Sequence, residues 1–262
     1  MKPFSKIKLL LGTFSIFVLL FLWLPIIILF LISFSSGRVT EWPPPGYTFK
    51  WYIEMIKNIR VFNAIETSFV IASATSIITC ILGLMISYSI TQLDIRFRQH
   101  IFSLIYLPMI ISPVIIGIGL VIFYHMIHLP LGRISVIIAH IIRSFPFVAL
   151  ILITSMAGVK KSLVEAALDL GASKFSAFKK IVLPLIAPAI IASLLIAFTI
   201  SFDDISTTYF VIGGGSVTVQ TYIMEQIQFV VTPEMNALTA SILLFSFIIV
   251  SIISILQRKR TS

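Results

Sequence analysis

Charged residues are scarce in this chain. Asp, Glu, Lys and Arg make up only 11% of its 262 residues, whereas hydrophobic residues make up 58%. Because a soluble domain carries about a quarter charged residues, this composition excludes an ordinary soluble protein. It indicates an integral membrane protein, in which each helical span needs roughly 20 apolar residues.

Cysteine is almost absent as well. The one cysteine, Cys80, lies inside an apolar run, which excludes a disulfide framework and a metal site built on paired cysteines. His125, His128 and His140 are too scattered along the sequence to predict a metal site. We therefore expect no metal and no cofactor in this chain.

The chain also lacks a phosphate-binding loop and an obvious catalytic centre. The glycine run at 213–215 is not followed by the Gly-Lys-Ser/Thr sequence that cradles phosphates. No nucleophile and base occur at a usable spacing, so we expect no enzymatic activity. The net charge of +9 does not predict nucleic-acid binding, because the basic residues lie between apolar runs and form no patch with interleaved aromatic residues.

Six apolar runs are long enough to cross a membrane. The first follows three lysines, as in a signal peptide, but it is too long for that role and no small-residue cleavage site follows it. We therefore expect it to be retained. The sequence predicts an all-α polytopic membrane protein with six transmembrane helices, at 9–34, 63–90, 101–128, 134–157, 181–202 and 235–256.

Basic residues are distributed unevenly between the two sides of these spans. The side that is richer in Lys and Arg faces the cytoplasm. The richer side comprises the two termini and the second-to-third and fourth-to-fifth connections, so we predict that both termini are cytoplasmic. Thirteen basic residues lie there (Lys2, Lys6, Lys8, Arg96, Arg98, Lys160, Lys161, Lys174, Lys179, Lys180, Arg258, Lys259, Arg260) and five on the other side (Arg38, Lys50, Lys57, Arg60, Arg133).

The same segmentation divides the chain into three parts. Residues 1–60 hold the first transmembrane helix and an external loop, 61–256 form a five-helix core, and 257–262 form a basic cytoplasmic tail. Prolines recur inside the spans and tend to kink helices, which is typical either of a bundle that changes shape or of membrane helices in general. They are Pro25, Pro108, Pro113, Pro146, Pro184 and Pro188.

The longest cytoplasmic connection, at about 159–180, has the pattern of a helical hairpin. Apolar residues from Leu163 to Leu170 recur at near-helical spacing. Gly171 is suited to end this helix, and Ser173 is suited to cap a second helix that continues into the fifth span. Two interpretations of its apolar stripe are open: a helix that lies on the membrane surface, or a surface that docks a soluble partner.

The sequence of this hairpin resembles the signature loop of the membrane permease subunits of bacterial ABC importers, the binding-protein-dependent (MetI-like) family. The matching positions are Glu-Ala-Ala, three residues, Gly, nine residues and then Ile-x-Leu-Pro. The resemblance implies a coupling helix that inserts into a cleft of an ATP-binding subunit, with Glu165 pairing or capping at the joint and Gly171 making the bend. The coupling residues are then Glu165, Ala166, Ala167, Leu170, Gly171, Phe175, Ile181, Leu183 and Pro184.

The resemblance also implies a set of partners. A dimer of ATP-binding subunits would hold ATP and Mg, and a second, homologous permease subunit would complete the pathway. An extracytoplasmic solute-binding protein would deliver the solute. The chain itself would be a multi-pass protein of the bacterial inner (plasma) membrane, surrounded by lipid, and would work by alternating access.

Acidic residues follow the fifth span at 201–204, where the sequence is Ser-Phe-Asp-Asp. The connection after them carries Glu225 and Glu234 and no Lys or Arg. Carboxylates at a membrane boundary are costly to desolvate, so they predict a cation-attracting site beside the pathway, formed by Ser201, Asp203 and Asp204. The alternative is that both acids lie just beyond the hydrocarbon in water.

These motifs, together with those at 47–52 and 233–238, resemble the spermidine/putrescine-type members of the family. The resemblance implies a polyamine as the substrate. It departs from those members at Val114, where they can carry an acid. Other substrates of the family (ferric iron, a phosphonate, an opine) stay open, as does an ion-coupled secondary carrier, although the sequence shows no internal repeat.

Overall fold

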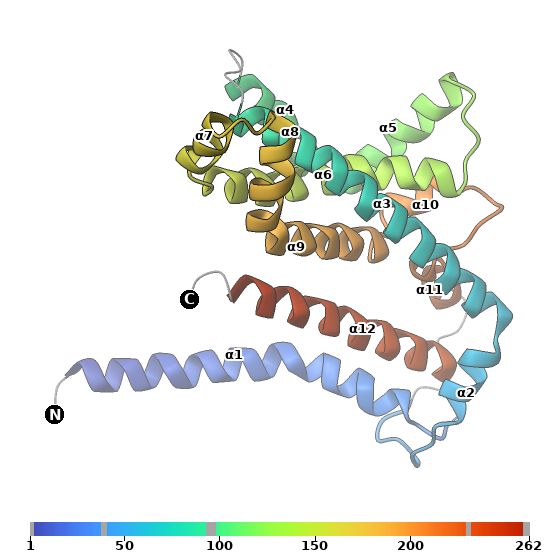
Figure 1. The fold of residues 1–262 in the computed structure, drawn as a ribbon. Helices are drawn as coiled ribbons and strands as arrows, with labels where there is room; N and C mark the ends of the chain where they lie inside the picture. The colour runs from blue at the N-terminus through green and yellow to red at the C-terminus, as the bar shows by residue number, and fades with distance from the viewer. Residues whose placement is uncertain (1–2, 38–40, 93–97, 229–231, 259–262) are drawn as a thin grey trace. The chain divides into compact units, whose positions relative to one another are not determined.

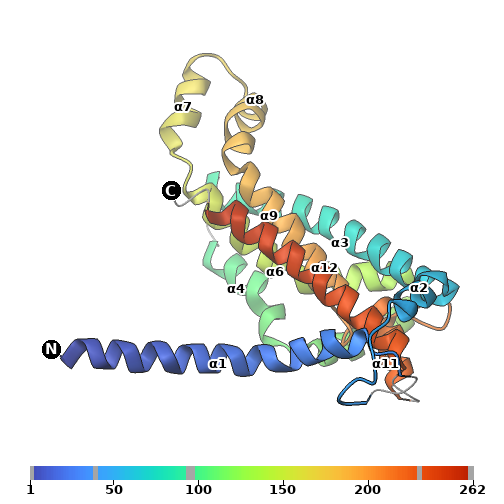
Figure 2. The same ribbon diagram turned by 90° about the horizontal axis from the view of Figure 1, so that it is seen from below.

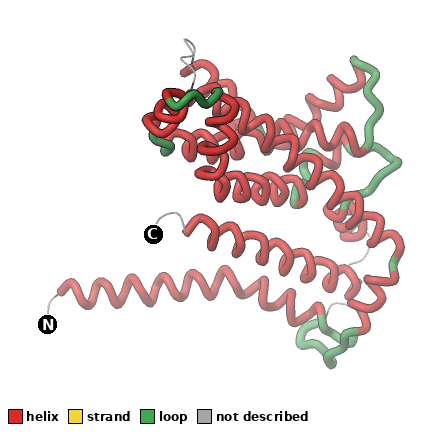
Figure 3. Tube along the Cα trace, viewed as in Figure 1, coloured by secondary structure: helices red, strands yellow, loops and turns green. Residues whose placement is uncertain are grey.

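The computed structural model describes residues 3–37, 41–92, 98–228 and 232–258. In these ranges the regular elements are helices, apart from a single bridge that pairs Ser35 with Tyr47 (Figure 3). This confirms the predicted all-α class. The chain forms two compact units: unit 1 comprises Met1–Phe62 and Ile223–Phe245, and unit 2 comprises Asn63–Tyr222 and Ser246–Ser262.

Unit 1 contains the first helix and the segment that follows it. Its helical parts are α1 (Pro3–Ser33), α2 (Lys50–Lys57), the start of α3 (Ile59–Gln92) up to Phe62, the end of α11 (Val219–Ile227) from Ile223 on and the first part of α12 (Pro233–Arg258) up to Phe245. The start of α2 is joined to the end of α1, because the Trp51 indole donates to the Ser35 carbonyl at 2.7 Å and the hydroxyls of Ser33 and Tyr52 lie 2.7 Å apart. The aromatic side chains that the loop between these helices exposes are Trp42, Tyr47 and Phe49.

Unit 2 is a helical bundle that carries the hairpin at one end (Figures 1 and 2). Within it, α6 and α9 form an extensive helix pairing. Buried side chains from α3, α6 and α9 form a continuous apolar cluster between them, among them Cys80, Leu152 and Ala197. Its elements are α3 (Ile59–Gln92, from Asn63 on), α4 (Arg98–Ile110), α5 (Pro113–Met126), α6 (Arg133–Ala157), α7 (Lys161–Asp169), α8 (Lys174–Ala177), the π-helical turn Phe178–Val182, α9 (Leu183–Phe202), α10 (Thr208–Val211), the start of α11 (Val219–Ile227, up to Tyr222) and the second part of α12 (Pro233–Arg258, from Ser246 on).

Five helical segments of the described chain are long and apolar enough to cross a membrane, and a bent pair makes a sixth. They coincide with the six predicted runs. The five segments are Lys8–Ser33, Ile59–Thr91, Arg133–Ala157, Lys174–Phe202 and Pro233–Ile253.

The third predicted span is not the continuous helix expected over 101–128. It is broken into α4 and α5, which are bent by 102°. The break lies at Ser112, whose ψ of 136° is extended, directly before Pro113 at the start of α5. Proline lacks an N–H and disfavours the helical conformation of the residue before it, so the chain leaves the helix here instead of merely kinking.

Gly83 marks a close approach of α3 to α6. A Cβ atom at this position would lie 2.7 Å from Val148 Cγ1 and 3.1 Å from Leu152 Cδ1. We expect Gly83→Val to lower the free energy of unfolding by about 1–3 kcal/mol, because overpacking forces the neighbouring side chains to shift. Thermal unfolding of the purified subunit in detergent measures this. Gly119→Val is the matched control, since a Cβ there meets nothing within 4 Å, and equal losses in both variants would contradict the prediction.

The predicted orientation, with both termini in the cytoplasm, stays a prediction. Several residues on which it rests lie outside the described residues, namely Lys2, Arg38, Arg96, Lys259 and Arg260. The same holds for 259–262 of the predicted basic tail. The predicted boundary after residue 60 lies close to the end of the first segment of unit 1 at Phe62, whereas unit 1 also includes part of the sixth span.

Candidate functional site

A helical hairpin projects from one end of unit 2 (Figure 2). Its first helix, α7, ends at Gly171, whose φ of +83° lies in the left-handed region. The Gly171 N–H donates to Leu168 O at 2.9 Å and the Ala172 N–H to Ala167 O at 3.0 Å, which is the Schellman pattern of helix ends. The Ser173 hydroxyl then accepts from the Ser176 N–H and caps α8. The order helix, glycine turn, helix is the one expected from the sequence.

The tip of the hairpin holds apolar side chains out of the bundle. Leu170 is 90% exposed and Phe175 is 73% exposed, and Glu165 and Ala166 on α7 are exposed as well. These side chains add nothing to the core of the subunit. An exposed apolar tip of this kind is typical of a surface that contacts a partner protein or a membrane.

The base of the hairpin is packed firmly onto the bundle. Val182 and Ile186 are buried against Met156 and Val159 at the end of α6, with Leu183 packed alongside. Pro184 has no N–H to continue the helical ladder, and the π-helical turn lies directly before its helix. The predicted coupling residues therefore separate into an exposed tip and a base that includes the half-buried Ala167, Ile181 and Leu183.

The base also lines a groove. An open apolar groove of about 500 Å³ runs between α3 and the segment after the hairpin turn. Phe178 closes it from one side and meets the Tyr88 ring edge-on, with 4.9 Å between the ring centroids. Phe175 lies at its rim. The base of the hairpin is thus in contact with both α3 and the end of α6.

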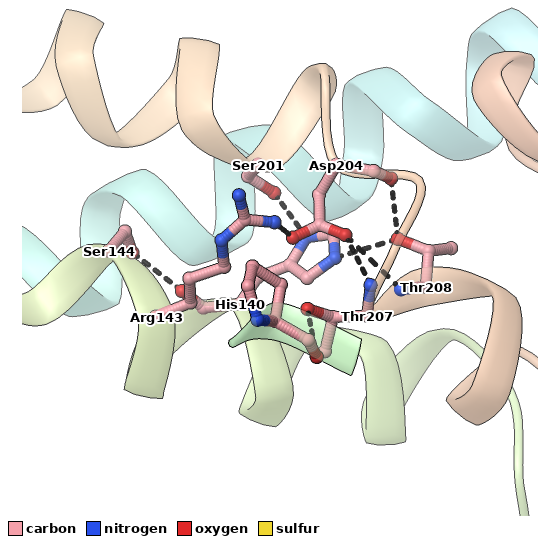
Figure 4. A network of polar contacts seen from close by, with 8 residues as sticks. His140, Arg143, Ser144, Ser201, Asp204, Thr207 and Thr208 are labelled. Carbon is pink, nitrogen blue, oxygen red and sulfur yellow. Dashed lines mark hydrogen bonds and ion pairs between the residues drawn. The ribbon is translucent and has the colours of Figure 1, made fainter. Parts of the chain in front are cut away.

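At the other end of α9, Asp204 is fully buried and neutralised (Figure 4). Its carboxylate forms an ion pair with Arg143 of α6. Its other oxygen accepts from the backbone N–H groups of Thr207 at 2.8 Å and Thr208 at 3.3 Å. An arginine in the middle of a membrane helix requires such a partner, because an isolated charge there is costly.

Ser201 and His140 extend this network (Figure 4). Ser201 is buried, and its hydroxyl lies 2.7 Å from His140 Nδ1. His140 Nε2 lies 2.8 Å from the Thr208 hydroxyl. The network thus joins α6, the end of α9 and the start of α10.

Asp203 differs from its neighbour because its side chain is exposed. Gln220 Nε2 and Ser246 Oγ donate to its Oδ1 at 3.5 Å, the long limit of a hydrogen bond. Ser246 lies near the middle of α12 along the sequence. Asp203 therefore lies within reach of side chains from the start of α11 and from α12. The predicted position of both acids at the outer boundary of the membrane stays a prediction.

The sequence alone does not identify the partner of Arg143 or the contacts of His140. A usable signal was present: the two residues are three positions apart on one helix, and such pairs share a face. A polar face in the middle of an apolar helix requires polar partners on a neighbouring helix. No group of three or more His, Cys, Asp and Glu side chains that could hold a metal ion is found among the residues that the structure describes.

Comparisons with known proteins agree with this architecture. Residues 80–261 match the family model of the binding-protein-dependent transport system inner membrane component. The chain is 29% identical over 255 residues to the spermidine/putrescine transport system permease protein PotC of Escherichia coli (strain K12), covering 97% of this chain and 96% of that protein. It is 32% identical over 232 residues to the putrescine transport system permease protein PotI of the same strain, covering 85% of this chain and 82% of that protein.

Two solved structures have a similar fold. One is a bacterial ABC transporter involved in the import of the acidic polysaccharide alginate, with a TM-score of 0.76, 17% identity and coverage of 100% of this chain and 99% of that one. The other is a bacterial alginate ABC transporter in complex with an alginate pentasaccharide-bound periplasmic protein, with a TM-score of 0.72, 19% identity and coverage of 98% and 96%.

The family match extends over most of the chain and includes the hairpin, the Arg143–Asp204 pair and Asp203. Together with the apolar helices, it identifies a transport component of the inner membrane and not an enzyme. The chain belongs to the family of inner membrane components of binding-protein-dependent transport systems, the permease subunits of ABC transporters.

Proposed function

We propose that this chain is a permease subunit of an ATP-driven importer that moves a polyamine, spermidine or putrescine, into the cytoplasm. The observation that carries the proposal is the similarity to PotC over 97% of the chain, with PotI as a second relative. The charge of the segment between α9 and α12 supports it. Residues 203–232 carry three acids and no Lys or Arg, which favours a cationic solute over an anionic one.

In this proposal the hairpin formed by α7 and α8 docks into an ATP-binding partner. The exposed Leu170 and Phe175 supply the apolar contact, and Glu165 on α7 supplies a charge at the rim. ATP and Mg are held by that partner. A second, homologous permease subunit and a solute-binding protein complete the importer.

A continuous helical segment joins the hairpin to the acids. One helical segment, Lys174–Phe202, runs from the hairpin turn through the π-helical turn to the residue before Asp203. A rigid-body movement of the hairpin therefore displaces both ends of this segment together. This links nucleotide-driven closure of the partner to the acids, as alternating access requires.

The two adjacent acids have different roles in this proposal. Asp203 is exposed and has only two long hydrogen bonds, so its carboxylate remains free to attract an ammonium group. Asp204 is already bound by Arg143 and by the backbone N–H of Thr207, and the Ser201 hydroxyl is bound by His140. Of the three predicted pathway residues, Asp203 therefore contacts the cation. Ser201 and Asp204 do not contact the cation and instead hold the backbone next to Asp203 in place.

We expect Asp203→Asn to raise the KM for spermidine uptake about tenfold with little change in the maximal rate, because a lost charge-assisted contact costs about 1.5 kcal/mol or more. Uptake kinetics in cells that express the whole importer measure this. Glu225→Gln, which neutralises an exposed acid of the same segment, is the matched control and leaves the KM unchanged. An unchanged KM in Asp203→Asn removes this residue from the cation site.

Competition for uptake distinguishes the proposed substrate class from the others that the family offers. Labelled putrescine is supplied to a host that lacks its own polyamine uptake and expresses the importer. We expect unlabelled spermidine to suppress uptake, and ferric citrate, a phosphonate and an opine to leave it unchanged. No putrescine uptake by a correctly assembled importer would rule out the polyamine assignment and leave the family assignment intact.

A further inference from the structure

The corner between α9 and α10 is held by two side chains of α6, Arg143 and His140 (Figure 4). This corner carries Asp203 and Asp204. Arg143 reaches the carboxylate of Asp204, and His140 lies one turn earlier on the same face of the helix. The two contacts differ in kind, since one is an ion pair and the other is a bridge of hydrogen bonds.

The protons in the hydrogen-bonded bridge can be placed one by one. The Thr208 hydroxyl donates to the Asp204 backbone carbonyl at 2.7 Å, so its oxygen is free only to accept. His140 Nε2 must therefore carry the proton and donate to Thr208. Nδ1 of the neutral ring then accepts from the Ser201 hydroxyl. Every polar atom in the bridge has one partner of the right kind, so the bridge has a single arrangement.

The ion pair holds the same corner through the side chain of Asp204. Asp204 binds Arg143 through one oxygen and the N–H groups of Thr207 and Thr208 through the other. These N–H groups lie at the start of α10, where backbone donors lack helical partners. The Thr207 hydroxyl in turn donates to the carbonyl of Pro113, at the break between α4 and α5, at 3.4 Å. The corner thus connects α6, α9, α10 and the start of α5.

We infer that Arg143 and His140 are positioning residues that hold this corner so that Asp204 is turned inward and Asp203 outward. Adjacent carboxylates compete for the same partners. The Arg143 ion pair and the hydrogen bonds of His140 hold the corner so that Asp204, and not Asp203, reaches those partners. Asp203 is then left as the one exposed, weakly bonded acid of the pair. The inference rests on the proposed function in that Asp203 is taken as the group that meets the cation.

A cysteine at position 203 reports the orientation of the corner independently of transport. The only native cysteine, Cys80, is buried, and Cys80→Ala gives a cysteine-free background. In membranes that contain the whole importer, Asp203→Cys in this background is treated with a trimethylammonium-bearing methanethiosulfonate. Thr208→Val removes the hydroxyl that joins His140 to the Asp204 carbonyl and leaves the ion pair intact. Thr208→Ser retains that hydroxyl.

We expect Thr208→Val to change the labelling rate at position 203 several-fold, and Thr208→Ser to leave it unchanged. Arg143→Gln/Asp204→Asn, which removes the ion pair without leaving a lone charge, also changes the rate. The control is Arg133→Gln/Glu66→Gln, which removes an exposed ion pair elsewhere and leaves the rate unchanged. Labelling at the parental rate in both Thr208→Val and the Arg143/Asp204 double variant overturns the inference.

Uptake kinetics separate this inference from the proposed function. With Asp203 in place, Thr208→Val raises the KM for spermidine without lowering the maximal rate, and Thr208→Ser restores the KM. If labelling changes while the KM does not, Arg143 and His140 still position the corner, and the role of Asp203 as the cation contact fails. If neither changes, the positioning role fails whatever the substrate.

Discussion

Arg143→Gln is expected to remove most of the folded subunit from the membrane. The variant leaves Asp204 as a buried carboxylate without its cation, in a side chain that is fully shielded from solvent. Breaking a buried ion pair on one side costs about 3–5 kcal/mol, and a typical domain has only 5–15 kcal/mol of stability in total. The amount of subunit that elutes as a single species in size-exclusion chromatography in mild detergent measures the loss.

A double variant distinguishes the effect of the lone charge from the effect of lost side-chain volume. Arg143→Gln/Asp204→Asn removes both charges and is expected to recover much of the folded subunit, because no buried charge is left alone. Arg133→Gln breaks the ion pair with Glu66, in which both side chains are more than 40% exposed, and exposed pairs contribute only about 0–1 kcal/mol. Equal losses in the single and double Arg143 variants would show that the pair is not what stabilises this corner.

Leu170→Asp is expected to abolish uptake while the subunit stays folded. Leu170 is 90% exposed at the tip of the hairpin, so the core loses nothing when it is replaced. In the proposed interface it is an apolar anchor, and the loss of such an anchor costs 2 kcal/mol or more, a factor of roughly 30 in affinity. Co-purification of the ATP-binding partner and uptake of labelled spermidine both measure the effect.

Leu170→Met is the matched control, since it keeps an apolar side chain of similar volume at the same position. It is expected to retain the partner and the uptake. If Leu170→Asp retained the ATP-binding partner and transported at the wild-type rate, the tip of the hairpin would not be the docking surface. The apolar stripe would then be better explained by a helix on the membrane surface.

The hairpin could be predicted from the sequence because its signals are local. Gly171 and Ser173 end and start helices through bonds that reach only a few residues along the chain. The broken third span was also signalled locally, by Pro113, but the sequence does not say whether a proline kinks a helix or ends it. Whether the proline kinks or ends the helix depends on tertiary packing. Here that packing includes the hydrogen bond from the Thr207 hydroxyl to the Pro113 carbonyl.

The pairing of Arg143 with Asp204 could not be predicted in the same way. It joins two helices that are distant in the sequence, and either of the two adjacent acids fits the arginine on charge alone. The choice depends on which acid the end of α9 turns inward. The sequence shows only that the two acids are adjacent, and the structure shows that they lie in opposite environments, with Asp204 buried and Asp203 exposed.

The most direct test of this account is uptake of labelled spermidine into proteoliposomes. They contain this chain, its partner permease and the ATP-binding subunits, with the solute-binding protein outside and ATP inside. The account predicts accumulation that requires ATP and this chain, and that is lost in Leu170→Asp. Accumulation without ATP would contradict it. So would ATP hydrolysis that is stimulated only when the solute-binding protein carries a solute other than spermidine or putrescine.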